Sequence, residues 1–291
     1  MNVALQGMLD RYQPRTLGDH ENALKEIVQE LALLGLWRAK FFEHAAFYGG
    51  TALRIFHRLP RFSEDIDFSL LQPNREFDTA SYLEAVRMEL AAFGFSFSVE
   101  HRAKRVSTAI ESAFIKGGTR INLARIGTPD YLRARLPELQ QVRIRIELDT
   151  DPPPLAQYEV LTLLTPIPFQ VRLFDLPCLF AGKLHAILCR NWKSRVKGRD
   201  FYDFVWYLGR QDPCNVRHLQ ARMTQTGHGQ RDGELDIPQL RRLLRQRFGQ
   251  VDFDQARSDV RPFIRDDAEL ALWDTTFFQS LAERVEAVPS V

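Results

Sequence analysis

The sequence of 291 residues contains few cysteines, and their spacing is not that of a structural site. There are three, Cys178, Cys189 and Cys214, and no two of them form a C-x-x-C pair. An odd number without this spacing excludes a framework of paired disulfides and argues against a zinc site. The seven histidines include no H-x-x-x-H pair, which would put two ligands on one helical face. We therefore expect reduced thiols and no structural transition metal.

Long hydrophobic runs are also absent. The longest candidate, LALLGLW at 31–37, falls well short of the roughly 18 residues that a membrane span needs. The first residues, MNVALQGMLDRYQPR, lack a basic segment followed by an apolar one, so they predict no export signal. We expect a cytoplasmic protein that does not enter the membrane, and its length favours two domains over one.

The sequence has little excess of either charge, but its basic residues are concentrated in two places. The net charge is only +2, yet residues 101–145 hold ten Lys and Arg against three acids. Residues 183–199 hold six basic residues and no acid. These runs are either two solvated faces or a surface for a polyanionic partner such as a nucleotide or RNA.

The hydrophobic pattern changes its period near residue 175. Up to that point, alternation typical of strands dominates, with helical spacing at 21–42, 49–59 and 79–93. Strands are predicted at 44–48, 61–70, 95–101, 104–115, 120–126, 142–150, 159–164 and 169–174, with a hairpin turn at Lys116–Gly118. Beyond it, helices are predicted at 176–192, 199–210, 237–248, 253–264 and 269–285. The sequence therefore predicts an α/β (α+β) fold: a mixed-sheet domain over 1–174 followed by a helical domain over 175–291.

The segment FYGGTALRIFHRLPRFSEDIDFSL at 47–70 carries the most informative chemistry. Asp65 and Asp67 alternate with apolar residues, so they share one face of a strand at about 6.6 Å between their Cα atoms. Two ionised carboxylates this close repel each other unless a cation lies between them. Oxygen ligands of this kind suit Mg²⁺, which is commonly held by one or two carboxylates together with substrate phosphates.

A phosphate site is predicted just before these aspartates. Gly49 and Gly50 stand between a strand and a helix, where the backbone can approach a phosphate and the helix N-terminus faces the negative charge. Thr51 adds a hydroxyl donor.

The spacing of Gly50, Thr51, Asp65 and Asp67 resembles the signature of the polymerase-beta-like nucleotidyltransferase superfamily. The resemblance implies transfer of a nucleotide from an NTP with one or two Mg²⁺ ions, and a third carboxylate on a neighbouring strand. VRIRIELDT offers Glu147 first and Asp149 second. Glu147 would complete the metal site or accept the proton of the attacking hydroxyl. The competing interpretation is a cross-strand salt bridge between Glu147 and an arginine.

Four blocks are similar to the AbiEii/AbiGii toxin-like nucleotidyltransferases: GGTALR at 49–54, RFSEDIDF at 61–68, GKLHAILCR at 182–190 and KGRDFYDFVWYL at 197–208. This resemblance implies a toxin with a cognate antitoxin, and tRNA 3′ ends as the nucleotide acceptor. It also implies that Lys183 binds phosphates and that the acids Asp200 and Asp203 belong to the site. A cap or a salt bridge to Lys183 or Arg199 is the alternative for Asp200.

Arg61 and Ser63 belong to the same blocks, and both are candidates for nucleotide binding. Arg61 either contacts phosphate or stabilises the loop before Asp65. Two other functions stay open at this point: a nucleotidyltransferase that modifies a protein or a small molecule, and a non-catalytic binding module.

Overall fold

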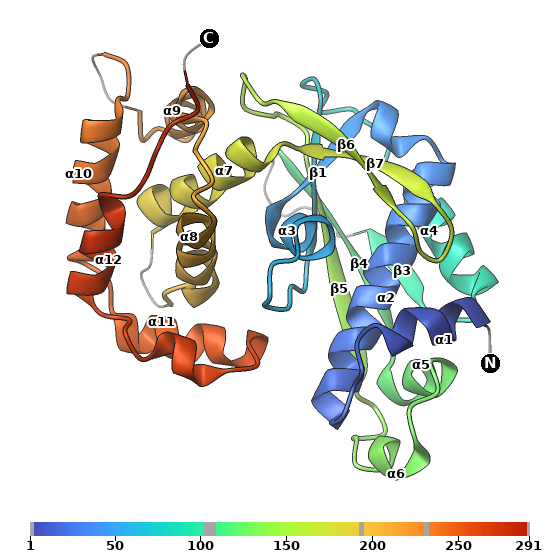
Figure 1. Cartoon of the computed structure of the whole chain (residues 1–291). Helices are drawn as coiled ribbons and strands as arrows, with labels where there is room; N and C mark the ends of the chain where they lie inside the picture. The colour runs from blue at the N-terminus through green and yellow to red at the C-terminus, as the bar shows by residue number, and fades with distance from the viewer. Residues whose placement is uncertain (1–2, 102–108, 192–194, 230–232, 290–291) are drawn as a thin grey trace. The chain divides into compact units, whose positions relative to one another are not determined.

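The computed structural model describes residues 3–101, 109–191, 195–229 and 233–289 (Figure 1). The chain forms two compact units. The first comprises Met1–Ala52, Ser63–Pro152 and Glu159–Leu173, and the second comprises Leu53–Phe62, Pro153–Tyr158 and Phe174–Val291. The domain limits proposed from the sequence differ from these units, since residues 53–62 and 153–158 group with the helical part.

A mixed sheet organises the first unit (Figure 1). Its seven strands in the described part of the chain have the order β3-β4-β5-β2-β1-β7-β6. β2 is parallel to β5 and β1 is parallel to β7, whereas β1–β2, β3–β4 and β4–β5 are antiparallel. The strands are β1 (Ala45–Tyr48), β2 (Ile66–Leu70), β3 (Ser98–His101), β4 (Ile110–Gly118), β5 (Gln141–Asp149), β6 (Tyr158–Leu163) and β7 (Phe169–Phe174). This arrangement confirms the predicted α/β fold class.

Helices of the first unit pack beside the sheet. The longest, α2, begins with a capping box in which Thr16 and Asp19 bond to each other's backbone N–H groups. Phe47 of β1 and Phe68 of β2 are buried in the core, with ring centroids 5.4 Å apart. These helices are α1 (Val3–Asp10), α2 (Leu17–Arg38), α4 (Ala80–Ala92), α5 (Thr119–Arg125) and α6 (Asp130–Arg133), with the short η1 (Phe41–Glu43). α3 (Gly49–His57) begins in the first unit and continues into the second.

The predicted hairpin at Lys116–Gly118 is wrong. These residues end β4, and the strand expected at 120–126 is helix α5 instead. Thr119, Asn122, Leu123 and Ile126 are buried, a helical spacing, whereas Ile121 is 64% exposed. The first five residues of the strand predicted at 104–115 lie outside the described residues.

The second unit is helical from residue 176 onward (Figure 1). Its aromatic core is built around Phe278, whose ring stacks on Phe253 at 4.5 Å between centroids. The helices are α7 (Leu176–Cys189), α8 (Gly198–Arg210), α9 (Val216–Gln225), α10 (Ile237–Phe248), α11 (Phe253–Val260) and α12 (Thr275–Ala282), with η2 (Arg261–Phe263) and η3 (Asp267–Leu270). The sequence patterns did not predict α9. The single helix expected at 269–285 is divided into η3 and α12, because Asp274 caps a new helix start.

The cysteines are free thiols, and burial raises the pKa of Cys178 to about 12. Among the described residues, no helix combines the length and the apolar character that crossing a membrane requires.

Candidate active site

Gly49 and Asp67 are in close contact where β1 meets α3. Tyr48, the last residue of β1, pairs with Asp67 of β2. Gly49 follows with a φ of +82°, and a Cβ atom there would lie 2.4 Å from Asp67 Oδ2. Only glycine fits at this position, since a side chain would clash with the carboxylate and would strain the backbone. The backbone at the start of α3 therefore lies directly against the second carboxylate of the D-x-D pair.

The loop before Asp65 is held by two buried side chains of the first unit. Thr51 Oγ1 donates a hydrogen bond to the carbonyl of Asp65, and Thr51 is fully buried. Gln29 Nε2, on α2, donates to the carbonyls of Ser63 at 3.1 Å and Glu64 at 3.0 Å. Gln29 was not among the predicted site residues; its only signal in the sequence is that it is a polar residue inside the apolar stretch of α2.

The register of β5 places Glu147 beside Asp67. β2 and β5 are parallel neighbours, and Asp67 is opposite Glu147, whereas Asp149 is opposite Ser69. Neighbouring strands lie about 4.8 Å apart, so Glu147 is the acid of β5 next to Asp67. Glu147 Oε1 lies 3.1 Å from Arg145 Nη2. This ion pair runs along β5 and is not the cross-strand pair considered from the sequence.

The carboxylates of Asp65 and Asp67 are ligands that fit a hard divalent cation. Asp65 and Asp67 provide carboxylate oxygens and are both partly exposed. Within the ranges that the structure describes, no three His, Cys, Asp or Glu side chains are arranged to hold a metal ion. Two carboxylates are nevertheless sufficient for Mg²⁺ when substrate phosphates complete its coordination.

Lys183 lies in a second cluster of charged residues, within the second unit. Lys183 Nζ is 2.7 Å from Asp203 Oδ2 and 3.5 Å from Asp200 Oδ1. Asp200 Oδ2 also pairs with Arg190 Nη1. Asp200 and Asp203 are one turn apart on α8, so both acids lie on the same side of this helix. There they meet Lys183 of α7 and Arg190, which follows the last residue of α7. The salt-bridge alternative for Asp200 is therefore observed with Lys183.

Arg61 is the buried member of this cluster. Its Nε and Nη2 atoms each lie 2.6 Å from an oxygen of Asp203, and its Nη1 donates to the carbonyl of Phe62 at 2.9 Å. The side chains of Arg61 and Asp203 are 2% and 0% exposed. Burial by itself would raise the pKa of Asp203, but the charges of Arg61 and Lys183 outweigh it and keep that pKa below its ordinary value. Asp203 is therefore ionised.

The predicted site residues thus fall into two groups. Gly49, Gly50, Thr51, Ser63, Asp65, Asp67 and Glu147 belong to the first unit, and Arg61, Lys183, Asp200 and Asp203 belong to the second.

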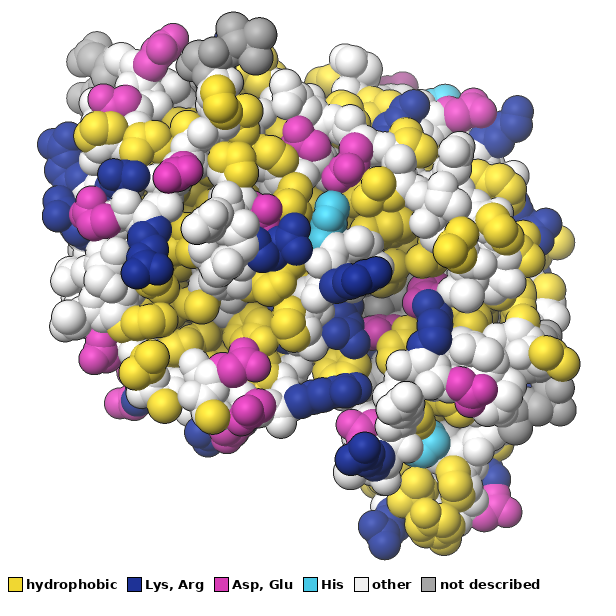
Figure 2. Space-filling model, in the orientation of Figure 1, with side chains coloured by type: hydrophobic (Ala, Val, Ile, Leu, Met, Phe, Trp, Pro, Cys, Tyr) yellow, Lys and Arg dark blue, Asp and Glu magenta, His cyan; other side chains and the backbone are white. Residues whose placement is uncertain are grey.

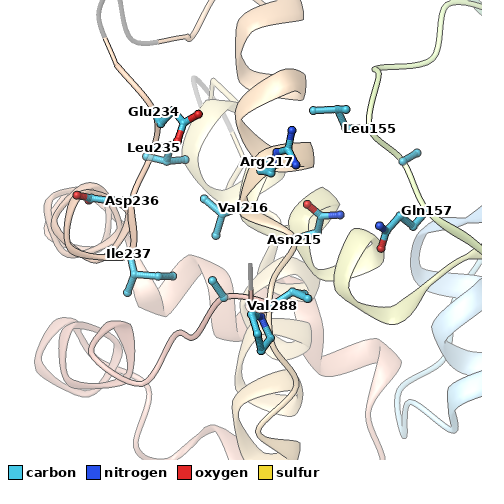
Figure 3. A pocket seen from close by; sticks show the side chains of 13 residues that line it. Leu155, Gln157, Asn215, Val216, Arg217, Glu234, Leu235, Asp236, Ile237 and Val288 are labelled. Atoms are coloured by element: carbon cyan, nitrogen blue, oxygen red, sulfur yellow. The ribbon is translucent and has the colours of Figure 1, made fainter. Parts of the chain in front are cut away.

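A separate cavity of about 690 Å³ lies within the second unit (Figure 3). It is lined by residues 155–157, 215–217, 234–237 and 287–289, and none of the predicted site residues is among them. Its polar lining includes Asn215 and Asp236, which cap the N-termini of α9 and α10.

Comparison with known proteins identifies the family. Two solved structures from Helicobacter pylori are similar, each at 16% identity over 89% of this chain: a candidate nucleotidyltransferase, with 93% of its own chain covered and a TM-score of 0.49, and JHP933, with 90% covered and a TM-score of 0.48. No curated protein matches the sequence. A family model described as nucleotidyl transferase AbiEii toxin, type IV toxin–antitoxin system, matches residues 31–283. The chain therefore belongs to the AbiEii family of nucleotidyltransferase toxins.

Proposed function

We propose that this toxin transfers an NMP from an NTP to the 3′ end of tRNA in a Mg²⁺-dependent reaction. The observation that carries the proposal is the contact of Gly49 with Asp67, because it joins a helix N-terminus to a carboxylate pair. The helix N-terminus suits phosphates and the carboxylate pair suits Mg²⁺, and a metal-bound NTP needs both.

The residues of the first unit have separate roles in this mechanism. Asp65 and Asp67 hold Mg²⁺, and the backbone N–H groups at the start of α3 bind the phosphates. When bound, Mg²⁺ neutralises charge on the attacking and leaving oxygens. Thr51 acts by fixing Asp65. Glu147 accepts the proton of the attacking hydroxyl, which then bonds to the α-phosphorus while pyrophosphate leaves.

In the second unit, Lys183 binds phosphate oxygens as a point charge. It is 13% exposed, so an anion can reach it, and its ion pairs with Asp203 and Asp200 hold its ammonium group in place.

Exposed arginines and an exposed tyrosine of the first unit support RNA as the acceptor. Arg125 and Arg135 are exposed on α5 and just after α6, and Tyr131 between them is 68% exposed. Exposed arginines and aromatic rings are typical of RNA contacts, because arginines bind phosphates and aromatic rings stack on bases. Part of the run at 101–145, residues 102–108, and residues 192–194 of the run at 183–199 lie outside the described residues.

The test is incubation of the purified protein with Mg²⁺, each labelled NTP in turn and total bacterial tRNA, followed by a denaturing gel. We expect labelled tRNA, and we expect Asp67→Asn or chelation of the metal to lower the rate at least about 100-fold. Asp151→Asn is the matched control, because it removes a carboxylate of the same unit that pairs with Arg75 at the surface. Label on a protein or a metabolite would replace tRNA as the acceptor, and full activity of folded Asp67→Asn would refute the site.

A further inference from the structure

Arg61 cannot reach a ligand in this structure, although it belongs to a motif of the proposed site. Its side chain is 2% exposed, and its guanidinium is bound to Asp203 on two sides and to the carbonyl of Phe62 on the third. Arg61 and Asp203 are 142 residues apart in the sequence. The pair therefore joins two distant segments of the second unit through a buried ion pair.

Buried ion pairs of this kind contribute little net stability. Removing two charges from water costs about as much as their attraction returns, and the large penalty comes when one partner is missing. A role in stability alone therefore does not explain why Arg61 and Asp203 are both charged. The position of Lys183 suggests another reason.

Asp203 has two cationic partners, and only one of them is near solvent. Its Oδ2 atom lies 2.6 Å from Arg61 Nη2 and 2.7 Å from Lys183 Nζ. If an uncharged residue replaced Arg61, Lys183 would be the only cation beside the buried carboxylate of Asp203. Lys183 would then be held in a one-to-one pair, which would reduce its attraction for phosphate.

We propose that Arg61 is a positioning residue that neutralises Asp203 and so leaves the charge of Lys183 available to the phosphates of the NTP. The inference rests on the proposed function. Together, Arg61, Lys183 and Arg190 carry three positive charges against the two negative charges of Asp200 and Asp203. The surplus positive charge lies with Lys183 and Arg190, which are 13% and 36% exposed.

The experiment measures binding of inorganic tripolyphosphate with Mg²⁺ by calorimetry, because this probe does not depend on which base the enzyme selects. We expect Arg61→Met to weaken binding about tenfold or more, because Lys183 would then pair with Asp203 and would no longer give the probe a charge-assisted bond. The double variant Arg61→Met with Asp203→Asn removes both buried charges, so we expect it to recover most of the affinity. This recovery separates a positioning role from direct contact or from a general loss of structure.

Tyr202→Phe is the control for packing. Tyr202 is buried on α8 beside Asp203, and the change removes only its hydrogen bond to Glu269. We expect it to lower the melting temperature without changing tripolyphosphate affinity. The double variant has no unpaired buried charge, so weak binding by a folded double variant counts against the inference even where Arg61→Met is too unstable to measure.

Three results would overturn the inference. Wild-type affinity in folded Arg61→Met would show that Arg61 does not influence Lys183. A folded double variant that stays as weak as Lys183→Ala would show that neutralising Asp203 is not the role of Arg61. No binding by the wild-type protein would refute the proposed phosphate site together with this inference. If Lys183→Ala loses binding but Arg61→Met keeps it, the phosphate site stands and only the inference is overturned.

Discussion

Gly49 is the residue on which the geometry of the candidate site depends most directly. Gly49→Ala places a Cβ 2.4 Å from Asp67 Oδ2 at a φ of +82°. We expect the free energy of unfolding to fall by about 1–2 kcal/mol from the left-handed backbone. We expect the transfer rate to fall about 100-fold, because the Asp67 carboxylate must move. Rate measurements with labelled NTP, together with thermal unfolding, test both effects.

The control for this substitution is Gly7→Ala on α1, where no atom lies within 4 Å of the added Cβ. Alanine inside a helix is favoured over glycine by up to about 1 kcal/mol, so stability should rise slightly and activity should not change. Normal activity in Gly49→Ala would mean that Asp67 can move without consequence, which contradicts its proposed role.

Single residues also show how far sequence reasoning reaches. Asp65, Asp67 and the glycines can be proposed from the sequence because their chemistry depends on spacing along one short segment. The resemblance to a known family already favoured Glu147 over Asp149, but the position of Glu147 opposite Asp67 depends on the register of β2 against β5, which no local pattern encodes. The pairing of Arg61 with Asp203 was not found, because it joins residues 142 positions apart.

Helix α8 carries two acids of the site on an amphipathic helix that its sequence predicts well. Its first residue, Gly198, packs against α11 so closely that a Cβ would lie 1.9 Å from the carbonyl oxygen of Ala256. We expect Gly198→Ala to lower the free energy of unfolding by about 3 kcal/mol or more, since backbone atoms must separate. Denaturant unfolding measures this.

Gly209→Ala, near the other end of α8, gives the matched comparison. No atom lies within 4 Å of its added Cβ, so we expect a change within about 1 kcal/mol and in the stabilising direction. Equal effects of the two substitutions would show that the close approach of α8 and α11 is not maintained in solution.

The errors in predicting whole elements have a common physical origin. In RINLARI, apolar residues alternate over a few positions and also satisfy part of a helical period, so a short run does not separate the two. This segment forms helix α5 because a helix buries Leu123 and Ile126 against the rest of the unit. α9 was missed because few of its residues are apolar, and its buried residues are only His218, Leu219 and Met223.

The whole molecule has a net charge near zero, so its attraction for RNA must come from the placement of its charges. Lys and Arg side chains are spread among acidic and hydrophobic ones on the face shown in Figure 2. If Arg125 and Arg135 contact tRNA phosphates, tRNA affinity should fall steeply as salt rises. Replacing both by glutamine should reduce the slope of log affinity against log salt by about 0.7–0.9 for each phosphate that is no longer neutralised.

A second pair of substitutions separates placement from net charge. Arg38→Gln with Arg75→Gln changes the net charge equally, but these two arginines lie outside the basic runs and pair with Glu89 and Asp151. We expect the salt slope of this variant to equal that of the wild-type protein, as measured by filter binding at several salt concentrations. Equal slopes in all three proteins would place the RNA contacts elsewhere. Transfer that does not depend on salt would favour a small-molecule or protein acceptor, because neither carries the condensed layer of counterions that RNA loses on binding.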